Sequence, residues 1–116
     1  MVSAVQAELK AGAAKMDITN RDAAEPPDHL WARALVLSDG ETTAVIVTLD
    51  VVAIAEIGPI KNDFLPTVRA ALKKDLQIDP TRLLVNASHC HGEVCTDVAA
   101  RTIAVVKQAY EKLEPV

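Results

Sequence analysis

The chain has 116 residues, a mass of 12.4 kDa and a net charge of −4, and half of its residues are apolar. This composition excludes an intrinsically disordered chain, and the length is that of one domain, which we expect to span residues 1–116. Asp and Glu outnumber Lys and Arg 16 to 12, and only three residues are aromatic. The composition therefore excludes a nucleic-acid binder that uses a basic face or aromatic stacking platforms.

No apolar run is long enough to span a bilayer, because the longest, 42–55, contains Asp50. Residues 1–8 lack the basic start and the long apolar block of a secretory signal. We therefore expect a soluble protein with no transmembrane segment, in a compartment that the sequence leaves unknown.

The N-terminal segment leaves two structures open. Residues 5–16 are rich in Ala, Lys and Glu, which favours a helix, whereas Gly12 disfavours one, so a strand is the alternative. Residues 20–28 follow with clustered polar side chains and two adjacent prolines. This composition predicts a loop.

A β-hairpin is predicted around Asp39-Gly40, a dipeptide that accepts the positive φ angles of a tight turn. The apolar segments 30–37 and 43–54 lie on either side of it. The second segment is apolar on both alternating faces, so we expect a strand in the middle of the sheet.

Two helices and one further strand follow. After Gly58-Pro59, apolar residues recur every four positions up to Leu76 and predict a helix. A short apolar strand is predicted over 83–88. Apolar residues at helical spacing after Thr96-Asp97, a suitable N-cap, predict a last helix over 96–113.

These elements predict an α/β fold with the order β-β-β-α-β-α, in which helices pack on a mixed sheet of about four strands. Strand 83–88 should run parallel to strand 43–54, because the intervening helix returns the chain to the same end of the sheet. Asp50 would then lie near His89.

The segment 88–95, Ser-His-Cys-His-Gly-Glu-Val-Cys, concentrates potential metal ligands directly after the last strand. In an extended chain residues i and i+2 face the same side, so His89 and His91 would converge. Catalytic zinc sites use three protein ligands, and Glu93 or Cys95 could supply the third. We therefore predict a zinc site from these four residues; the alternative is a histidine pair in a loop that binds no metal.

Asp50 interrupts an apolar strand, where an acid needs a hydrogen-bond partner, a metal or access to solvent. It could orient a histidine ligand or handle protons, or it could cap the strand or pair with Arg33 across the hairpin. His29 has no neighbouring ligands and is interpreted as a loop histidine. Cys95 has the alternative of being a small buried residue.

Several segments, in order along the chain, resemble the N-terminal portion of the neutral/alkaline, non-lysosomal ceramidase family. They are LKAGAAKMDIT (9–19), LWARALVLSDG (30–40), AVIVTLD (44–50) and LLVNASHCH (83–91). The resemblance implies that the first segment is a strand, that His89 binds zinc, and that His91 contacts the reacting group or the zinc-bound water. The family hydrolyses the amide of N-acylsphingosines, with zinc polarising the carbonyl. We thus predict His91 and Asp50 as catalytic residues and a lipid amide as substrate.

The sequence departs from this family in its site. A second histidine, a glutamate, a tyrosine and a catalytic serine of the family have no counterpart here, and Cys90 and Gly92-Glu93 replace the usual Thr and Ser-Gly. We therefore predict a zinc-binding domain without a complete active site, or alternatively a non-catalytic metal-binding or structural module. Strands left uncovered predict a homodimer or higher oligomer, with helix 96–113 in the contact; the alternative is a monomer whose last helix folds back to cover the sheet alone.

Overall fold

The computed structural model describes residues 8–24, 26 and 29–116. In chain order the elements are β1 (Lys10–Asp17), β2 (Trp31–Ser38), β3 (Thr43–Leu49), α1 (Phe64–Leu76), a 3₁₀ helix (Pro80–Arg82), β4 (Leu83–Ala87), α2 (Val98–Glu111) and β5 (Glu114–Pro115). The predicted α/β class and the order of the main elements are confirmed. The short β5 was not predicted, and it makes the sheet five-stranded.

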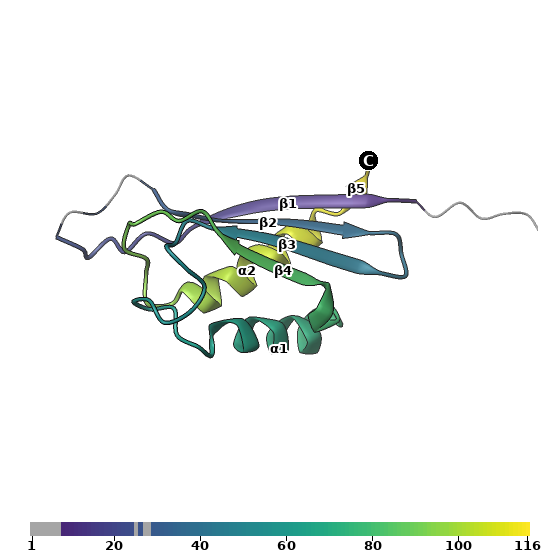
Figure 1. The fold of residues 1–116 in the computed structure, drawn as a ribbon. Coiled ribbons are helices and arrows are strands. Elements are labelled where there is room, and N and C mark those ends of the chain that lie inside the picture. Colours follow the sequence, from purple (N-terminus) through teal and green to yellow (C-terminus); the bar gives the residue numbers. More distant parts are fainter. Residues whose placement is uncertain (1–7, 25, 27–28) are drawn as a thin grey trace, which may run out of the picture.

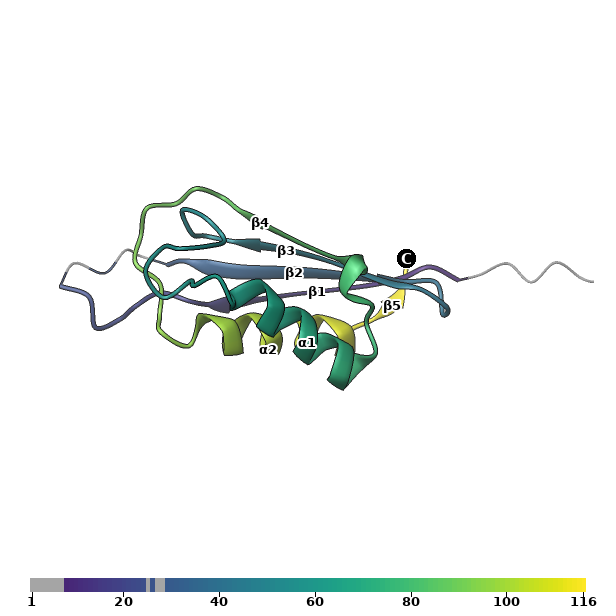
Figure 2. The ribbon, with the colours of Figure 1, turned by 60° about the horizontal axis from the view of Figure 1, so that its bottom comes forward.

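The sheet has the strand order β4-β3-β2-β1-β5. Strand β2 pairs antiparallel with both β1 and β3, whereas β4 runs parallel to β3, as predicted. Both helices lie on the same face of this sheet (Figure 1, Figure 2). Because β3 and β4 are parallel, their ends meet at one end of the sheet. Neither α1 nor α2 lies on the opposite face of the sheet.

Strand β1 forms in spite of its helix-favouring composition, because it pairs with β2 along its whole length and packs under α2. Gly12 is buried at this contact, and a Cβ placed there would lie 2.0 Å from the carbonyl oxygen of Ala109. The absence of a side chain lets the last turn of α2 approach the strand closely. Tertiary packing thus decides between the two structures that the sequence left open.

The predicted hairpin is present, and its turn is held by Asp39. The Asp39 carboxylate accepts the backbone N–H groups of Glu41 (3.0 Å) and Thr42 (2.8 Å), and Gly40 has a φ of 94°. These bonds lower the pKa of Asp39 below its ordinary value. The turn fixes the register in which β2 and β3 pair.

Strand β3 is shorter than predicted, since it ends at Leu49 and the expected strand ran to residue 54. The neighbouring strands end at nearly the same level: Ala32, the second residue of β2, pairs with Leu49, and β4 stops at Ala87 beside it. Apolar residues from Val51 onward instead belong to a loop in which Ile57 and Ile60 pair through their backbones. A run of apolar residues indicates burial but does not indicate how far the partner strands extend.

The helices bury one face each. Helix α1 begins at Phe64, so Pro66 lies in its first turn, where a missing N–H is tolerated. The buried side of α2 faces β1 and β2 of its own chain; its buried residues are Val98, Thr102, Val105, Val106 and Ala109. Self-association of this chain would therefore have to use other surfaces. No helix in the described part of the chain is long and apolar enough to cross a membrane.

Candidate functional site

The candidate site lies where β3 and β4 end, and it continues through residues 88–95. Ser88 donates its backbone N–H to Leu49 (2.9 Å), which continues the pairing of the two strands by one residue. The segment then crosses toward the end of β1, where Val94 forms a backbone bridge with Thr19. The fold thus brings Asp50, His89 and His91 to one edge of the sheet, as predicted.

The two histidine rings lie together, but for a different reason than the extended chain that was predicted. Strand β4 ends at Ala87, and His89 has a φ of 65°, in the left-handed region. The rings of His89 and His91 nevertheless meet edge to face, with centroids 4.7 Å apart. A turn at His89 brings the two rings together, and both side chains are exposed to solvent.

The hydrogen bond of His89 determines which ring nitrogen is available. Its Nδ1 lies 3.1 Å from the carbonyl oxygen of Val52. A carbonyl oxygen only accepts, so Nδ1 carries the hydrogen and the lone pair of the neutral ring is on Nε2. Metal-binding histidines commonly donate their second N–H to a carbonyl or carboxylate in this way. In its neutral form, His89 therefore has Nε2 available for a ligand.

Asp50 accepts three hydrogen bonds, from the backbone N–H of Trp31 (2.9 Å), from Ser88 Oγ (2.9 Å) and from Arg33 (3.2 Å). Partial burial opposes ionisation, but these donors outweigh it, so the pKa of Asp50 lies below its ordinary value. The predicted pairing of Asp50 with Arg33 across the hairpin is thus present, and Asp50 also binds Ser88, the residue before His89. A carboxylate so fully bonded is a weak base and a good support for its neighbours.

Glu93 and Cys95 have partners away from the histidines. Glu93 accepts a hydrogen bond from Asn20 Nδ2 (3.0 Å). Cys95 is buried, and burial together with the neighbouring Asp97 raises the pKa of its thiol to about 11. Metals bind the thiolate, so this raised pKa disfavours Cys95 as a metal ligand. The alternative of a small buried cysteine describes this environment.

Within residues 8–24, 26 and 29–116, no group of three or more His, Cys, Asp or Glu side chains is arranged to hold a metal ion. The histidine pair is therefore the part of the predicted ligand set that the fold brings together. Beside it lies an apolar cavity of about 300 Å³; its lining includes Val51, Val52, Ile57, Ile60, His91 and Val94. His91 thus borders a hollow that is suited to apolar groups.

Comparison of the sequence with protein-family models and with curated proteins gives no match. Among solved structures, neutral ceramidase from Pseudomonas aeruginosa matches with a TM-score of 0.70 and 15% sequence identity, over 96% of this chain and 23% of its own. A ceramidase complexed with C2 matches with a TM-score of 0.69 and 16% identity, over 95% of this chain and 22% of its own. The chain has the fold of a ceramidase segment. It spans less than a quarter of either ceramidase.

The ceramidase-like fold also contains a polar cluster at the end of β1 that sequence reasoning missed. Asp17 accepts hydrogen bonds from the backbone of Thr19 (2.8 Å), from Arg21 and from His29 (2.9 Å). Burial opposes ionisation here, yet the bonds lower the pKa of Asp17 well below its usual range. Arg101 of α2 donates to the Asp17 carbonyl (2.8 Å).

This cluster braces the segment that follows the histidines. The residues after β1 pair with that segment through Asn20 N to Glu93 O (2.9 Å) and Cys95 N to Ile18 O (2.8 Å). The only sequence signal for it was an Asp, an Arg and a His separated by a loop, which is too common a pattern to predict contact. His29, interpreted as a loop histidine, also stacks on Trp31 with ring centroids 5.1 Å apart.

Proposed function

We propose that this chain is a zinc-binding domain related to neutral ceramidases, in which His89 and His91 bind the metal. The observation that carries the proposal is the environment of His89, whose Nδ1–H is held by Val52 so that Nε2 is left for a ligand. The adjacent ring of His91 and the ceramidase-like fold support it.

The residues present fit two ligands of a zinc ion. Further ligands would have to be added to this pair, because Glu93 is bonded to Asn20 and the raised pKa of the Cys95 thiol disfavours the thiolate that a metal binds. When bound, zinc polarises an amide carbonyl and lowers the pKa of water. The substrate class that we propose is a lipid amide, whose apolar chain suits the cavity next to His91.

His91 and Asp50 would have different roles in the proposed site. His91 lies at the cavity wall and next to His89, where it can bind the metal or exchange a proton with the reacting group. Asp50, which was predicted as catalytic, acts in this proposal as a positioning residue, because it holds Ser88 next to His89. Its low pKa keeps it ionised for that purpose.

A second candidate function is a metal-binding or structural module without catalysis. The observation that favours it is the lack of a third ligand beside the two histidines among the described residues. Catalytic zinc sites have three protein ligands and one open position. The two functions differ in activity but share the metal, so the metal is the first thing to test.

Calorimetric titration with zinc tests the site directly. We expect binding to the wild-type chain, a loss of affinity of about tenfold or more in His89→Ala and in His91→Ala, and none detectable in the double variant. His29→Ala is the matched control, because it removes an exposed histidine outside the pair; circular dichroism verifies that the loss of its bond to Asp17 leaves the fold intact. Equal binding by the wild type and the double variant would overturn the proposed site.

A further inference from the structure

The face of the sheet opposite the helices carries a pattern of its own. Side chains at odd-numbered positions of β1 and β2 and at even-numbered positions of β3 and β4 point away from the buried core. Among them Leu84 is 59% exposed and Ile46 is 39% exposed, the latter in the middle of the sheet. We call this surface the open face.

The strand register sorts the open face into rows that cross four strands. One row is apolar and consists of Ala13, Leu35, Ile46 and Leu84, which are partners in successive strand pairs. The next row toward the candidate site is polar and consists of Lys15, Arg33, Thr48 and Asn86. Apolar and polar side chains thus form parallel bands across the sheet.

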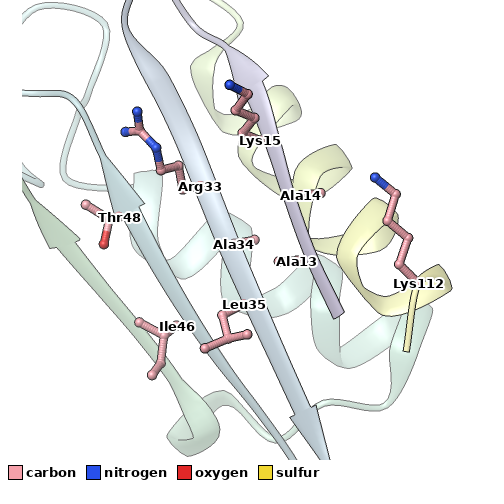
Figure 3. A pocket seen from close by; sticks show the side chains of 9 residues that line it. All are labelled: Ala13, Ala14, Lys15, Arg33, Ala34, Leu35, Ile46, Thr48 and Lys112. Carbon is pink, nitrogen blue, oxygen red and sulfur yellow. The ribbon is translucent and has the colours of Figure 1, made fainter. Parts of the chain in front are cut away.

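A shallow hollow of about 580 Å³ lies over these bands, with Leu35 and Ile46 side by side on its floor (Figure 3). Its three cations, Lys15, Arg33 and Lys112, all lie on the side of β1 and β2. The outward positions of β3 and β4 carry no Lys or Arg, and Asp50 lies at the end of β3. The three cations of the hollow therefore lie on the half of the open face that β1 and β2 form.

We propose that the open face binds a second copy of this chain, face to face, about a two-fold axis that runs parallel to the strands between β2 and β3. This operation lays β1 of one copy over β4 of the other and β2 over β3. Aligned packing of two sheets at about 10 Å is a common arrangement for exposed sheet faces. The interface is isologous, so each contact occurs twice.

The rows are complementary to themselves under this operation. Ala13 lies over Leu84 of the second copy, so the smallest member of the apolar row meets the most exposed one, and Leu35 lies over Ile46. In the polar row the two cations meet Asn86 and Thr48, and no like charges face each other. A second copy therefore places apolar side chains against the apolar row and polar partners against the polar row.

The other two-fold axis, across the strands, does not have this property. It would place Leu84 on Leu84 and Ala13 on Ala13, which crowds one end of the row and leaves the other end unfilled. It would also press the row that contains Arg33 onto Leu37 and Ala44, burying cations against apolar side chains. The register thus selects the axis along the strands.

Measurement of mass against concentration tests the association. We expect a mass of twice 12.4 kDa for the wild-type chain and at least about a tenfold weaker dimer for Ile46→Lys. Ile57→Lys is the matched control, because Ile57 is 40% exposed against 39% for Ile46 but lies in the loop before α1. A mass of 12.4 kDa at every concentration up to the millimolar range, or equal weakening by both variants, would overturn the proposal.

Cross-linking tests the arrangement. In a Cys90→Ser background, Ala13→Cys and Leu84→Cys chains are prepared separately and treated with a short bismaleimide, alone and mixed; Cys95 is buried and serves as an internal blank. We expect cross-linked dimers only in the mixture, because β1 faces β4. Cross-linking of Leu84→Cys alone would indicate the other axis, and none in a mixture that is dimeric by mass would indicate another surface. Either result would overturn the proposed interface.

Discussion

Asp50 connects three elements through one carboxylate, and this makes its contribution testable at the scale of a single residue. Its donors come from the start of β2, from within β2 and from the residue after β4. Removing the carboxylate leaves Ser88 without its partner and so loosens the chain at His89. The effect should therefore be on the position of His89 more than on the overall fold.

We predict that Asp50→Ala lowers the affinity for zinc by about tenfold to 100-fold, the range seen when groups that orient metal ligands are removed. Asp50→Asn should lose less, because its amide oxygen can take the place of Oδ2, which accepts from Trp31 and Arg33, and its NH2 group can donate to Ser88 Oγ in place of the bond that Oδ1 accepts. Zinc titration of both variants checks this, with circular dichroism to verify folding. Equal affinity in Asp50→Ala and the wild type would show that Asp50 does not position the site.

The two cysteines should differ in reactivity, because burial raises the pKa of the Cys95 thiol from 9.0 to about 11. A raised thiol pKa means less thiolate at a given pH, and at pH 8 this shift lowers the thiolate fraction about 100-fold. We predict that iodoacetamide alkylates Cys90 well before Cys95 at pH 8. We also predict that the Cys95 rate rises steadily as the pH approaches 11.

Mass spectrometry of peptides after timed alkylation measures both rates. Unfolding in urea is the control, because it removes the burial that protects Cys95 and should make the two rates similar. Equal rates in the folded protein at pH 8 would contradict the buried position of Cys95.

Among the elements, the contact between β1 and α2 depends on Gly12. A Cβ at this position would lie 2.0 Å from the carbonyl oxygen of Ala109 and 3.0 Å from the backbone nitrogen of Leu113, just after the end of α2. These are backbone atoms, which cannot move aside as the end of a side chain can. We predict that Gly12→Ala destabilises the fold by about 3 kcal/mol.

Urea denaturation checks this prediction through a lower midpoint. The control is Ala13→Ser, a change of similar size on the outward side of the same strand. An unchanged midpoint in Gly12→Ala would mean that α2 is not packed on β1 as described.

The elements also illustrate what the sequence could and could not predict. The hairpin was predictable because Asp39 and Gly40 act locally, through the turn itself. The choice between helix and strand at residues 10–17 was not, because it depends on α2, more than 80 residues away in sequence. The end of β3 likewise depends on where β2 and β4 stop. A structure that neighbouring residues determine can be predicted directly from the sequence, whereas the pairing of distant segments cannot.

The same limit applies to the candidate site. The neighbourhood of Asp50 and His89 was predictable from the parallel order of two strands, and the fold confirms it. The directions of Glu93 and Cys95 were not, because they depend on pairing of residues 93–95 with the end of β1. The sequence therefore indicated that the two histidine rings lie close together, whereas the positions of Glu93 and Cys95 could not be predicted from it.

At the scale of the whole molecule, the question is whether this chain can hydrolyse an N-acylsphingosine. Hydrolysis by zinc takes three protein ligands and an open position, and the described part of the chain brings two imidazoles together. We predict that the isolated chain, supplied with zinc, has no turnover approaching about 1 s⁻¹, a rate typical of slow enzymes. A fluorescent N-acylsphingosine provides the measurement.

His89→Ala is the control for this assay, because any residual signal that it retains does not come from the histidine pair. Turnover near 1 s⁻¹ that is lost in His89→Ala would contradict the prediction and would require another ligand. Ile46→Lys then locates that ligand: if the variant also loses turnover while still binding zinc, the missing group comes from a second copy across the open face. If it keeps full turnover as a monomer, the group belongs to the same chain.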